Sequence, residues 1–161
     1  MKMTIRHFVF LMLSVSFFTA TAPNSPAQSS RSSVSAAEVN GTFRMNFRGK
    51  YKQMANEIKV LALGGGKIRF SMDLIYPYTL RNGEVSVNMG GLDGEAAIKG
   101  DTAVYESEEF GVCKITFKFV SPGTLKIVQD GSDAGCGFGH NVTSAGTYRK
   151  VSGKKPKFES Q

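Results

Sequence analysis

An alternation of apolar and polar residues with a period of two recurs along the central region, and this pattern limits the possible folds more than any other feature. Apolar side chains occupy every second position in the segments 43–47, 68–74 and 113–119, with charged or polar residues between them. A β-strand with one buried face and one solvated face has this pattern. A helix would spread the same apolar residues around its circumference. The central region is therefore predicted to form a series of half-buried strands.

Short glycine-containing segments separate these runs and predict tight turns. They are the residues 64–66, 82–83, 90–94, 100–101 and 121–123. Asn82-Gly83 suits a two-residue type I′ hairpin, whose central residues both adopt positive φ. This division gives eight or nine strands. Their connections are too short for parallel crossovers, so consecutive strands are predicted to be antiparallel neighbours.

We therefore predict an all-β fold, an antiparallel up-and-down meander that closes into a small β-barrel of about eight strands. A two-sheet β-sandwich is the alternative. Large side chains such as Phe43, Phe70 and Phe117 would fill most of an eight-stranded interior. Small ones such as Ala62 and Ala96 would leave room for a ligand. The sequence leaves both a solid core and a ligand cavity open.

The first 27 residues have the features of an export signal. A basic start precedes an apolar run over residues 8–18, and the small residues at 25 and 27 suit cleavage after Ala27. The apolar run is shorter than the roughly 20 residues that a membrane-spanning helix needs. We therefore predict an exported chain, periplasmic or secreted, without a membrane span.

The remaining chain is predicted to hold one domain. Residues 28–38 are rich in serine and alanine and indicate a flexible lead-in, while residues 152–161 indicate a basic, disordered tail. Between them, residues 39–151 have the size of a single β-barrel domain.

The net charge of the chain favours some classes of partner over others. The formal charge is +7, and loss of Lys2 and Arg6 with the leader would lower it to +5. Part of this excess lies near the C-terminus, at Arg149, Lys150, Lys154, Lys155 and Lys157. A weak contact of this tail with an anionic surface is therefore one hypothesis. Nucleic acid is not an expected partner, because the chain is exported and has no recognisable reading module.

The two cysteines, Cys113 and Cys136, are predicted to form a disulfide. An even number of cysteines in an oxidising compartment favours a bridge. A hairpin around residues 122–123 would place Cys113 opposite about residue 130, and the glycine-rich loop 131–139 then returns Cys136 toward it. In the chain-entropy model, closing a loop of this length stabilises a fold by about 3 kcal/mol.

His140 follows Cys136 by four residues, but a bonded sulfur cannot act as a nucleophile beside it. One histidine without a close carboxylate or second histidine is also a weak metal site. The segment 135–140 is rich in glycine but lacks the lysine and hydroxyl of a phosphate-binding loop. We therefore predict no catalytic residues, no metal and no cofactor, and we do not expect an enzyme.

The C-terminal part of the chain resembles a motif of small exported bacterial proteins. The motif combines a cysteine in an alternating strand, Gln-x-Gly, Cys-Gly-Phe-Gly-x-Asn-Val and Gly-x-Tyr. In this sequence it comprises Cys113, Gln129 with Gly131, 136–142, and Gly146 with Tyr148. The resemblance covers a third to a half of the mature chain, and it implies a disulfide-pinned β-domain without implying an activity.

Similar terminal modules sometimes accompany periplasmic lysozyme inhibitors. The segment 144–149 also loosely resembles the Ser-Gly-x-x-Tyr loop of small barrel inhibitors, although the order of its residues differs. The resemblance implies a partner-binding loop, and the candidate residues are His140, Asn141, Ser144, Tyr148 and Arg149. Lysozymes are themselves usually basic, so a positively charged chain would be repelled by them.

These observations lead to one main hypothesis and two alternatives. The main hypothesis is a non-enzymatic, exported binding module for a protein or a small apolar ligand of the cell envelope. The first alternative is an inhibitor of lysozyme-type wall hydrolases. The second is a lipocalin-like carrier of a small ligand, although the chain has no tryptophan for the Gly-x-Trp signature of that family.

Overall fold

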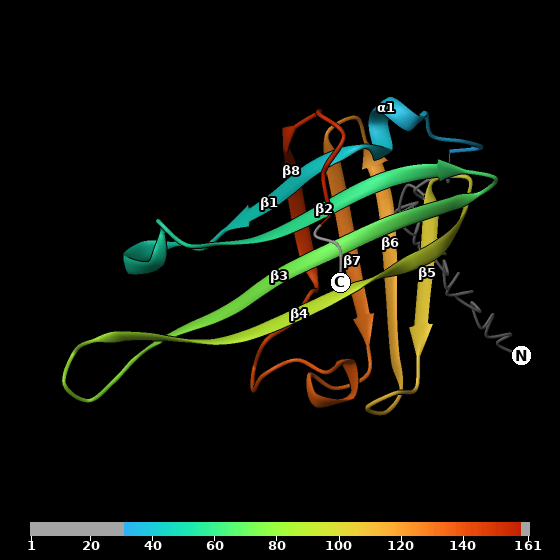
Figure 1. The fold of residues 1–161 in the computed structure, drawn as a ribbon. Helices are drawn as coiled ribbons and strands as arrows, with labels where there is room; N and C mark the ends of the chain where they lie inside the picture. Colours follow the sequence, from blue (N-terminus) through green and yellow to red (C-terminus); the bar gives the residue numbers. More distant parts are fainter. Residues whose placement is uncertain (1–30, 159–161) are drawn as a thin grey trace, which may run out of the picture.

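A computed structural model describes residues 31–158 and shows a closed barrel of eight antiparallel strands (Figure 1). Each strand pairs with the next along the chain, and β8 pairs with β1 to close the ring. The predicted small all-β barrel is confirmed, and the alternative of an open two-sheet sandwich is wrong. The predicted signal peptide at 1–27, the start of the lead-in and the last three residues of the tail lie outside the described residues.

The elements follow one another in a simple order along the barrel. The strands are β1 (Gly41–Asn46), β2 (Ala55–Gly64), β3 (Lys67–Thr79), β4 (Val85–Lys99), β5 (Thr102–Ser107), β6 (Cys113–Ser121), β7 (Thr124–Asp130) and β8 (Gly146–Ser152). Three short helical turns accompany them: α1 (Ala36–Val39), η1 (Gly49–Tyr51) and η2 (Ala134–Cys136).

Two predicted turns differ from the structure. The segment 90–94 is not a turn but the middle of β4, where it pairs with residues 70–74 of β3, and this continuity sets the number of strands at eight. The loop at Asn82-Gly83 is longer than predicted. Gly83 N donates to Leu80 O, and Leu80 N donates to Glu84 O, so only Gly83 of this loop needs positive φ. This is a three-residue hairpin loop rather than a type I′ turn.

Large side chains fill the barrel interior. The rings of Phe70 and Phe117 lie 4.8 Å apart, and those of Phe43 and Phe119 lie 6.3 Å apart across the core. All four side chains are buried, as is Tyr148 on β8. The sequence left a solid core and a hollow one open, and the packing of these rings corresponds to the solid core.

Strands β3 and β4 extend beyond the barrel as a two-stranded arm (Figure 1). Strand β2 pairs with β3 only as far as Asp73, whereas β4 accompanies β3 to Thr79. Because β2 does not pair with this part of β3, the strand tolerates Pro77, which has no N–H to donate. Next to it, Ile75 N donates to the side-chain oxygen Oδ1 of Asn56 at 2.8 Å, which replaces a missing strand partner.

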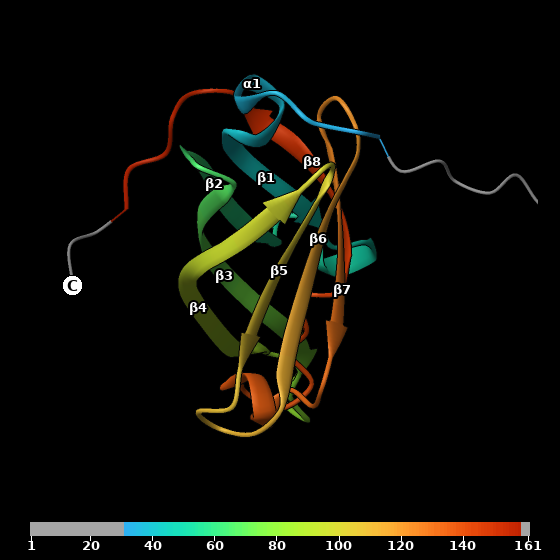
Figure 2. The same cartoon turned by 90° about the vertical axis from the view of Figure 1, so that its right-hand side faces the viewer.

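Part of the predicted lead-in is structured and covers one end of the barrel (Figure 2). Ser35 and Glu38 form a capping box at the start of α1. Lys150, which the sequence placed in the basic tail, lies beneath this helix. Its Nζ donates to the backbone oxygens of Ala37, Glu38 and Asn40, and it lies 5.0 Å from the ring centroid of Phe43. Lys150 therefore fastens α1 to β8.

The same end contains a buried carboxylate, Asp101, in the turn between β4 and β5. Its oxygens accept hydrogen bonds from Lys118 Nζ at 2.8 Å, Thr102 Oγ1 at 2.9 Å and Arg31 N at 3.0 Å. The hydrogen bond from Lys118 is the main cause that lowers the pKa of Asp101 from 3.8 to about 2. The charged form is therefore the one that the fold stabilises.

We expect acid to weaken the fold through this group. A carboxyl whose pKa is lowered by folding contributes its full stabilisation above the unfolded value, and this contribution is lost as the pH falls toward about 2. Thermal unfolding between pH 5 and pH 2 should show a falling melting temperature. In Asp101→Asn the fall should be shallower, although not absent, because the pKa of Glu38 is also lowered to about 2. An unchanged pH dependence in Asp101→Asn would contradict the assignment.

Candidate protein-binding surface

A disulfide joins Cys113, the first residue of β6, to Cys136 in η2. The predicted bridge is confirmed, with the two Cα atoms 4.9 Å apart. The register of the β6–β7 hairpin explains the pairing, because Lys114 lies opposite Asp130 and the chain then turns back toward Cys113. The bridge pins the β7–β8 connection to the end of the barrel opposite α1 (Figure 2).

Residues 137–142 of this connection are also held against β4. The ring of Phe138 packs on Gly90, where an added Cβ would lie 2.9 Å from its Cδ1 atom. Gly139 N donates to Met89 O at 3.0 Å, and Asn88 Nδ2 donates to the backbone oxygen of His140 at 2.7 Å. Residues 137–142 therefore lie along a part of β4 that does not pair with β5.

Asp133 fixes the shape of the same loop. Its carboxylate accepts hydrogen bonds from Ala134 N at 2.8 Å and Asn141 N at 2.6 Å. These backbone donors, with Ala134 first, lower the pKa of Asp133. The His140 side chain is 84% exposed, and its Nδ1 lies 4.0 Å from Asp133. Asn141 adopts a φ of 63°, and both His140 and Asn141 are exposed to solvent.

The structure does not bring all five predicted partner-binding residues together. Ser144 is buried, and its N and Oγ donate to Gln129 Oε1 at 2.8 and 2.9 Å. Tyr148 is also buried, and its hydroxyl donates to Ser144 O at 2.9 Å. Desolvation raises the pKa of Tyr148. These two residues hold the loop from inside, so a partner at this loop would touch His140 and Asn141 directly.

Arg149 lies apart from that loop. It is exposed on β8 and pairs across the sheet with Thr124, at the start of β7, whereas the loop follows the end of β7. Its Nη1 donates to Thr124 Oγ1. The partner-binding role of the five residues stays a prediction, and their positions divide them into two exposed loop residues, two buried supports and one distant arginine.

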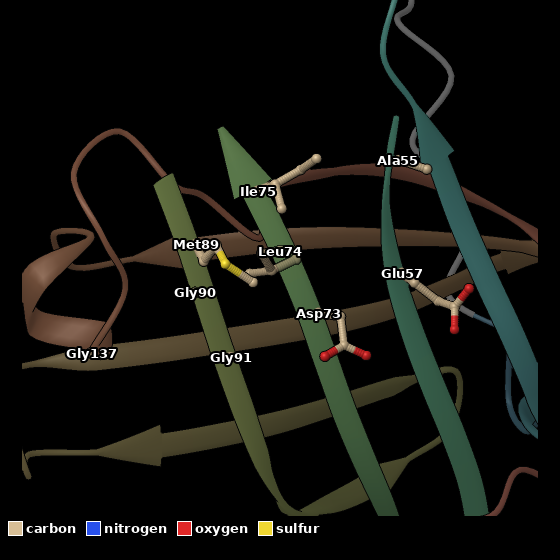
Figure 3. Close-up of a pocket in the computed structure, with 9 residues that line it drawn as sticks. All are labelled: Ala55, Glu57, Asp73, Leu74, Ile75, Met89, Gly90, Gly91 and Gly137. Atoms are coloured by element: carbon tan, nitrogen blue, oxygen red, sulfur yellow. The ribbon is translucent and has the colours of Figure 1, made fainter. Parts of the chain in front are cut away.

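Three adjoining depressions lie at this end of the barrel, beside the β5–β6 and β7–β8 connections. The first, of about 340 Å³, is lined by Ala55, Glu57, Asp73, Leu74, Ile75, Met89, Gly90, Gly91 and Gly137 (Figure 3). The second, of about 60 Å³, is lined by Gly91, Leu92, Tyr105, Ser107, Glu109, Phe110, Cys113, Gly135, Cys136 and Gly137. The third, of about 440 Å³, is lined by Glu106, Ser107, Glu108, Val112, Cys113 and Lys114. Because neighbouring depressions share residues, we treat them together as the loop-end surface.

The loop-end surface is apolar and acidic. Met89, Phe110 and Val112 are 70%, 67% and 72% exposed, more than any other large apolar side chain in residues 31–158. Among the lining residues, Glu57, Asp73, Glu106, Glu108 and Glu109 are acidic, and Lys114 is basic. Figure 3 shows the carboxylates of Glu57 and Asp73 on the same face of β2 and β3. Lys114 is itself engaged with Glu106 at 2.8 Å.

The residues of this surface were not predicted as a site. Phe110 and Val112 lie in a loop, where no periodicity marks a side chain as exposed or buried. The one available signal was the segment 108–112, in which two apolar side chains follow two glutamates between strands. Met89 belongs to an alternating strand, and only the pairing of β4 shows which of its faces is exposed.

The fold and this surface define a closed antiparallel β-barrel with disulfide-pinned loops. Comparisons with models of protein families, with curated proteins and with solved structures found no match. Within residues 31–158, no three His, Cys, Asp or Glu side chains are grouped to hold a metal ion. In the same range, no helix is long and apolar enough to cross a membrane.

Proposed function

We propose that this protein is a non-enzymatic, exported binding module that recognises a basic protein partner through the loop-end surface. One observation carries the proposal: the three most exposed large apolar side chains of residues 31–158 line adjoining depressions together with five carboxylates. Exposed apolar patches with a polar rim are typical of protein interaction sites. The acidic rim then favours a partner with the opposite charge.

The packed interior supports a surface site over a carrier function. Aromatic rings meet across the core, as the 4.8 Å separation of Phe70 and Phe117 shows. A small ligand in the barrel would have to displace such side chains, which typically costs several kcal/mol for each large residue removed from a core. The lipocalin-like alternative therefore has less support than a surface partner.

The disulfide supports the same proposal. It fixes η2 against β6, beside Phe110 and Gly137, so the loops that form the surface are held before a partner arrives. A surface that is already ordered loses less conformational entropy on binding than a flexible one. The bridge is also compatible with the predicted export to an oxidising compartment.

We expect polar substitution of the apolar centre to abolish partner binding. The variant Phe110→Ser with Val112→Ser removes two exposed apolar side chains, and exposed loop positions tolerate such changes without a large loss of stability. A matched control is Leu63→Ser, which changes an exposed apolar residue at the far end of β2. The measurement is cross-linking of the exported, tagged protein in its host, followed by mass spectrometry.

The proteins recovered with each variant test the proposed binding site. Basic proteins should be recovered with the unchanged protein and with Leu63→Ser, and lost with the double variant. Recovery of the same proteins at equal yield with all three forms would refute the loop-end surface as the binding site.

Inhibition of a lysozyme-type hydrolase is a second candidate, and the local charge of the surface favours it. The net positive charge of the chain argues against a basic partner, but five acids line the loop-end surface. Three of them are paired with Arg44, Lys59 and Lys114, whereas Glu108 and Glu109 make no ion pair within residues 31–158. A lysozyme turbidity assay tests this candidate. Clearing should slow in the presence of the protein and recover with Glu108→Lys and Glu109→Lys, whereas Glu84→Lys on the arm should behave as the unchanged protein. Unchanged clearing by chicken-, goose- and invertebrate-type enzymes would exclude it.

A further inference from the structure

A basic depression of about 510 Å³ lies outside the loop-end surface, where β1 and β8 separate. It is lined by Arg44, Met45, Asn46, Arg48, Thr147, Arg149 and Val151. None of these residues lines the three depressions around the disulfide. The ion pair between Arg44 and Glu57, at 2.6 Å, marks the border, because Arg44 lines the basic depression and Glu57 lines the acidic one.

The depression results from the way the barrel closes. Strands β1 and β8 pair only as far as Arg44 and Arg149, and β1 then continues to Asn46 without a partner on that side. The Met45 side chain occupies the space beside Gly146, where an added Cβ would lie 2.4 Å from its sulfur. The result is a gap between the strands with an apolar residue beside Gly146 and arginines along its edge.

The arginines that line the depression use only some of their N–H donors within the described residues. A guanidinium carries five N–H donors in a fixed planar arrangement. Arg44 uses a donor on Glu57, and Arg149 uses Nη1 on Thr124. Arg48 is exposed and makes no ion pair with any other residue in the range 31–158. Thr147 and Asn46 add a hydroxyl and an amide, and both residues are exposed.

We propose that this depression binds phosphate groups. Guanidinium groups bind phosphate oxygens through paired, charge-assisted hydrogen bonds. Three arginines line this depression, and one of them, Arg44, is paired with a carboxylate. Lys126 lies opposite Thr147 in the β7–β8 pairing and adds a further positive charge beside the depression. The depression, at about 510 Å³, is larger than a single phosphate ion, so it suits a polyphosphate or the phosphate of a larger headgroup.

This site differs from the basic tail that the sequence indicated. Lys150 is occupied by three backbone oxygens beneath α1, so it does not form part of a free cationic patch. Arg149 instead lies with Arg44 and Arg48, which are about a hundred residues away in sequence. The anion site is therefore built by barrel closure and not by consecutive basic residues.

Calorimetric titration at low salt tests the proposal with two probes. Inorganic tripolyphosphate represents a free phosphate, and phosphatidylglycerol vesicles, compared with phosphatidylcholine vesicles, represent a lipid headgroup. We expect Arg48→Ala and Arg149→Ala each to weaken binding by about tenfold, because each removes charge-assisted hydrogen bonds. Arg48→Lys should recover only part of the affinity, since an ammonium lacks the planar fork.

Two further variants make the test specific. Lys99→Ala removes one positive charge from the exposed end of β4 and should bind as the unchanged protein. Glu57→Gln removes the carboxylate that holds Arg44 and should tighten binding severalfold. Binding of tripolyphosphate alone assigns a soluble ligand, and binding of anionic vesicles assigns a headgroup.

Two results would overturn the proposal. The first is equal affinity of the unchanged protein, Arg48→Ala and Arg149→Ala for whichever probe binds. The second is the absence of binding of both probes to the unchanged protein, with folding checked by circular dichroism.

Discussion

Replacing Cys113 and Cys136 together by alanine should lower the free energy of unfolding by about 3 kcal/mol. The bridge joins residues 23 positions apart, and a cross-link of this length removes about that much conformational entropy from the unfolded chain. Both side chains are buried, so alanine is preferable to serine, which would bring an unpartnered hydroxyl into the core. Guanidinium unfolding monitored by circular dichroism gives the measurement.

The slope of the unfolding curve provides an internal check. Without the bridge the unfolded chain is less compact, so the dependence of the free energy on denaturant should become steeper. Reduction of the unchanged protein should reproduce the lower stability. A loss of less than about 1 kcal/mol would show that the bridge contributes little to the fold.

The two proposed sites should respond differently to the same change. Cys136 lies in η2 and lines the loop-end surface, whereas the basic depression is formed by β1 and β8. In a folded protein without the bridge, partner binding should fall because η2 is no longer held beside Phe110. Tripolyphosphate affinity should stay within about twofold, since the barrel closure itself does not involve the bridge.

Much of the fold could be predicted because the alternation shows which side chains of each strand face the core. A shift of one residue would move every buried side chain of a strand to solvent, so the alternation in segments such as 113–119 fixes which side chains face the core. The disulfide followed from the number of cysteines and the predicted compartment. Neither inference requires knowledge of contacts between distant segments.

The segment 90–94 differs from the turn that its sequence predicts. Its glycines predict a turn, but two of them allow close packing inside β4. An added Cβ at Gly90 would lie 2.9 Å from Phe138, and one at Gly94 would lie 2.9 Å from Tyr105. Both partners come from other parts of the chain, so the sequence of the segment alone cannot distinguish a turn glycine from a packing glycine.

The candidate sites were predictable only in part, for a related reason. Ser144 and Tyr148 were expected to face a partner but lie buried, because local sequence does not show which loop residues the barrel covers. The basic depression combines Arg44 and Arg48 with Arg149, and only closure between the first and last strands brings them together. Long-range pairing of this kind is not contained in any local pattern.

The contact between Phe138 and Gly90 leads to the second large prediction. Phe138→Ala should lower the free energy of unfolding by about 3 kcal/mol, since it removes a buried aromatic ring and leaves a cavity. Gly90→Ala should also destabilise the protein, by about 1–2 kcal/mol, because its methyl group would press on the ring and on Phe138 Cβ. Gly91→Ala is the matched control: an added Cβ there meets only Met72 O, at 3.7 Å, and the change should be nearly neutral.

A double-mutant cycle separates this contact from general damage to the strand. If Gly90 is required because Phe138 lies against it, Gly90→Ala should cost clearly less once the ring is gone. The coupling energy between the two positions should then be about 1 kcal/mol or more, which exceeds the usual scatter of additive pairs. Additive effects would mean that Gly90 is needed for the backbone of β4 itself. Since Phe138 also anchors residues 137–142, the coupling measures how firmly the barrel holds the loop-end surface in place.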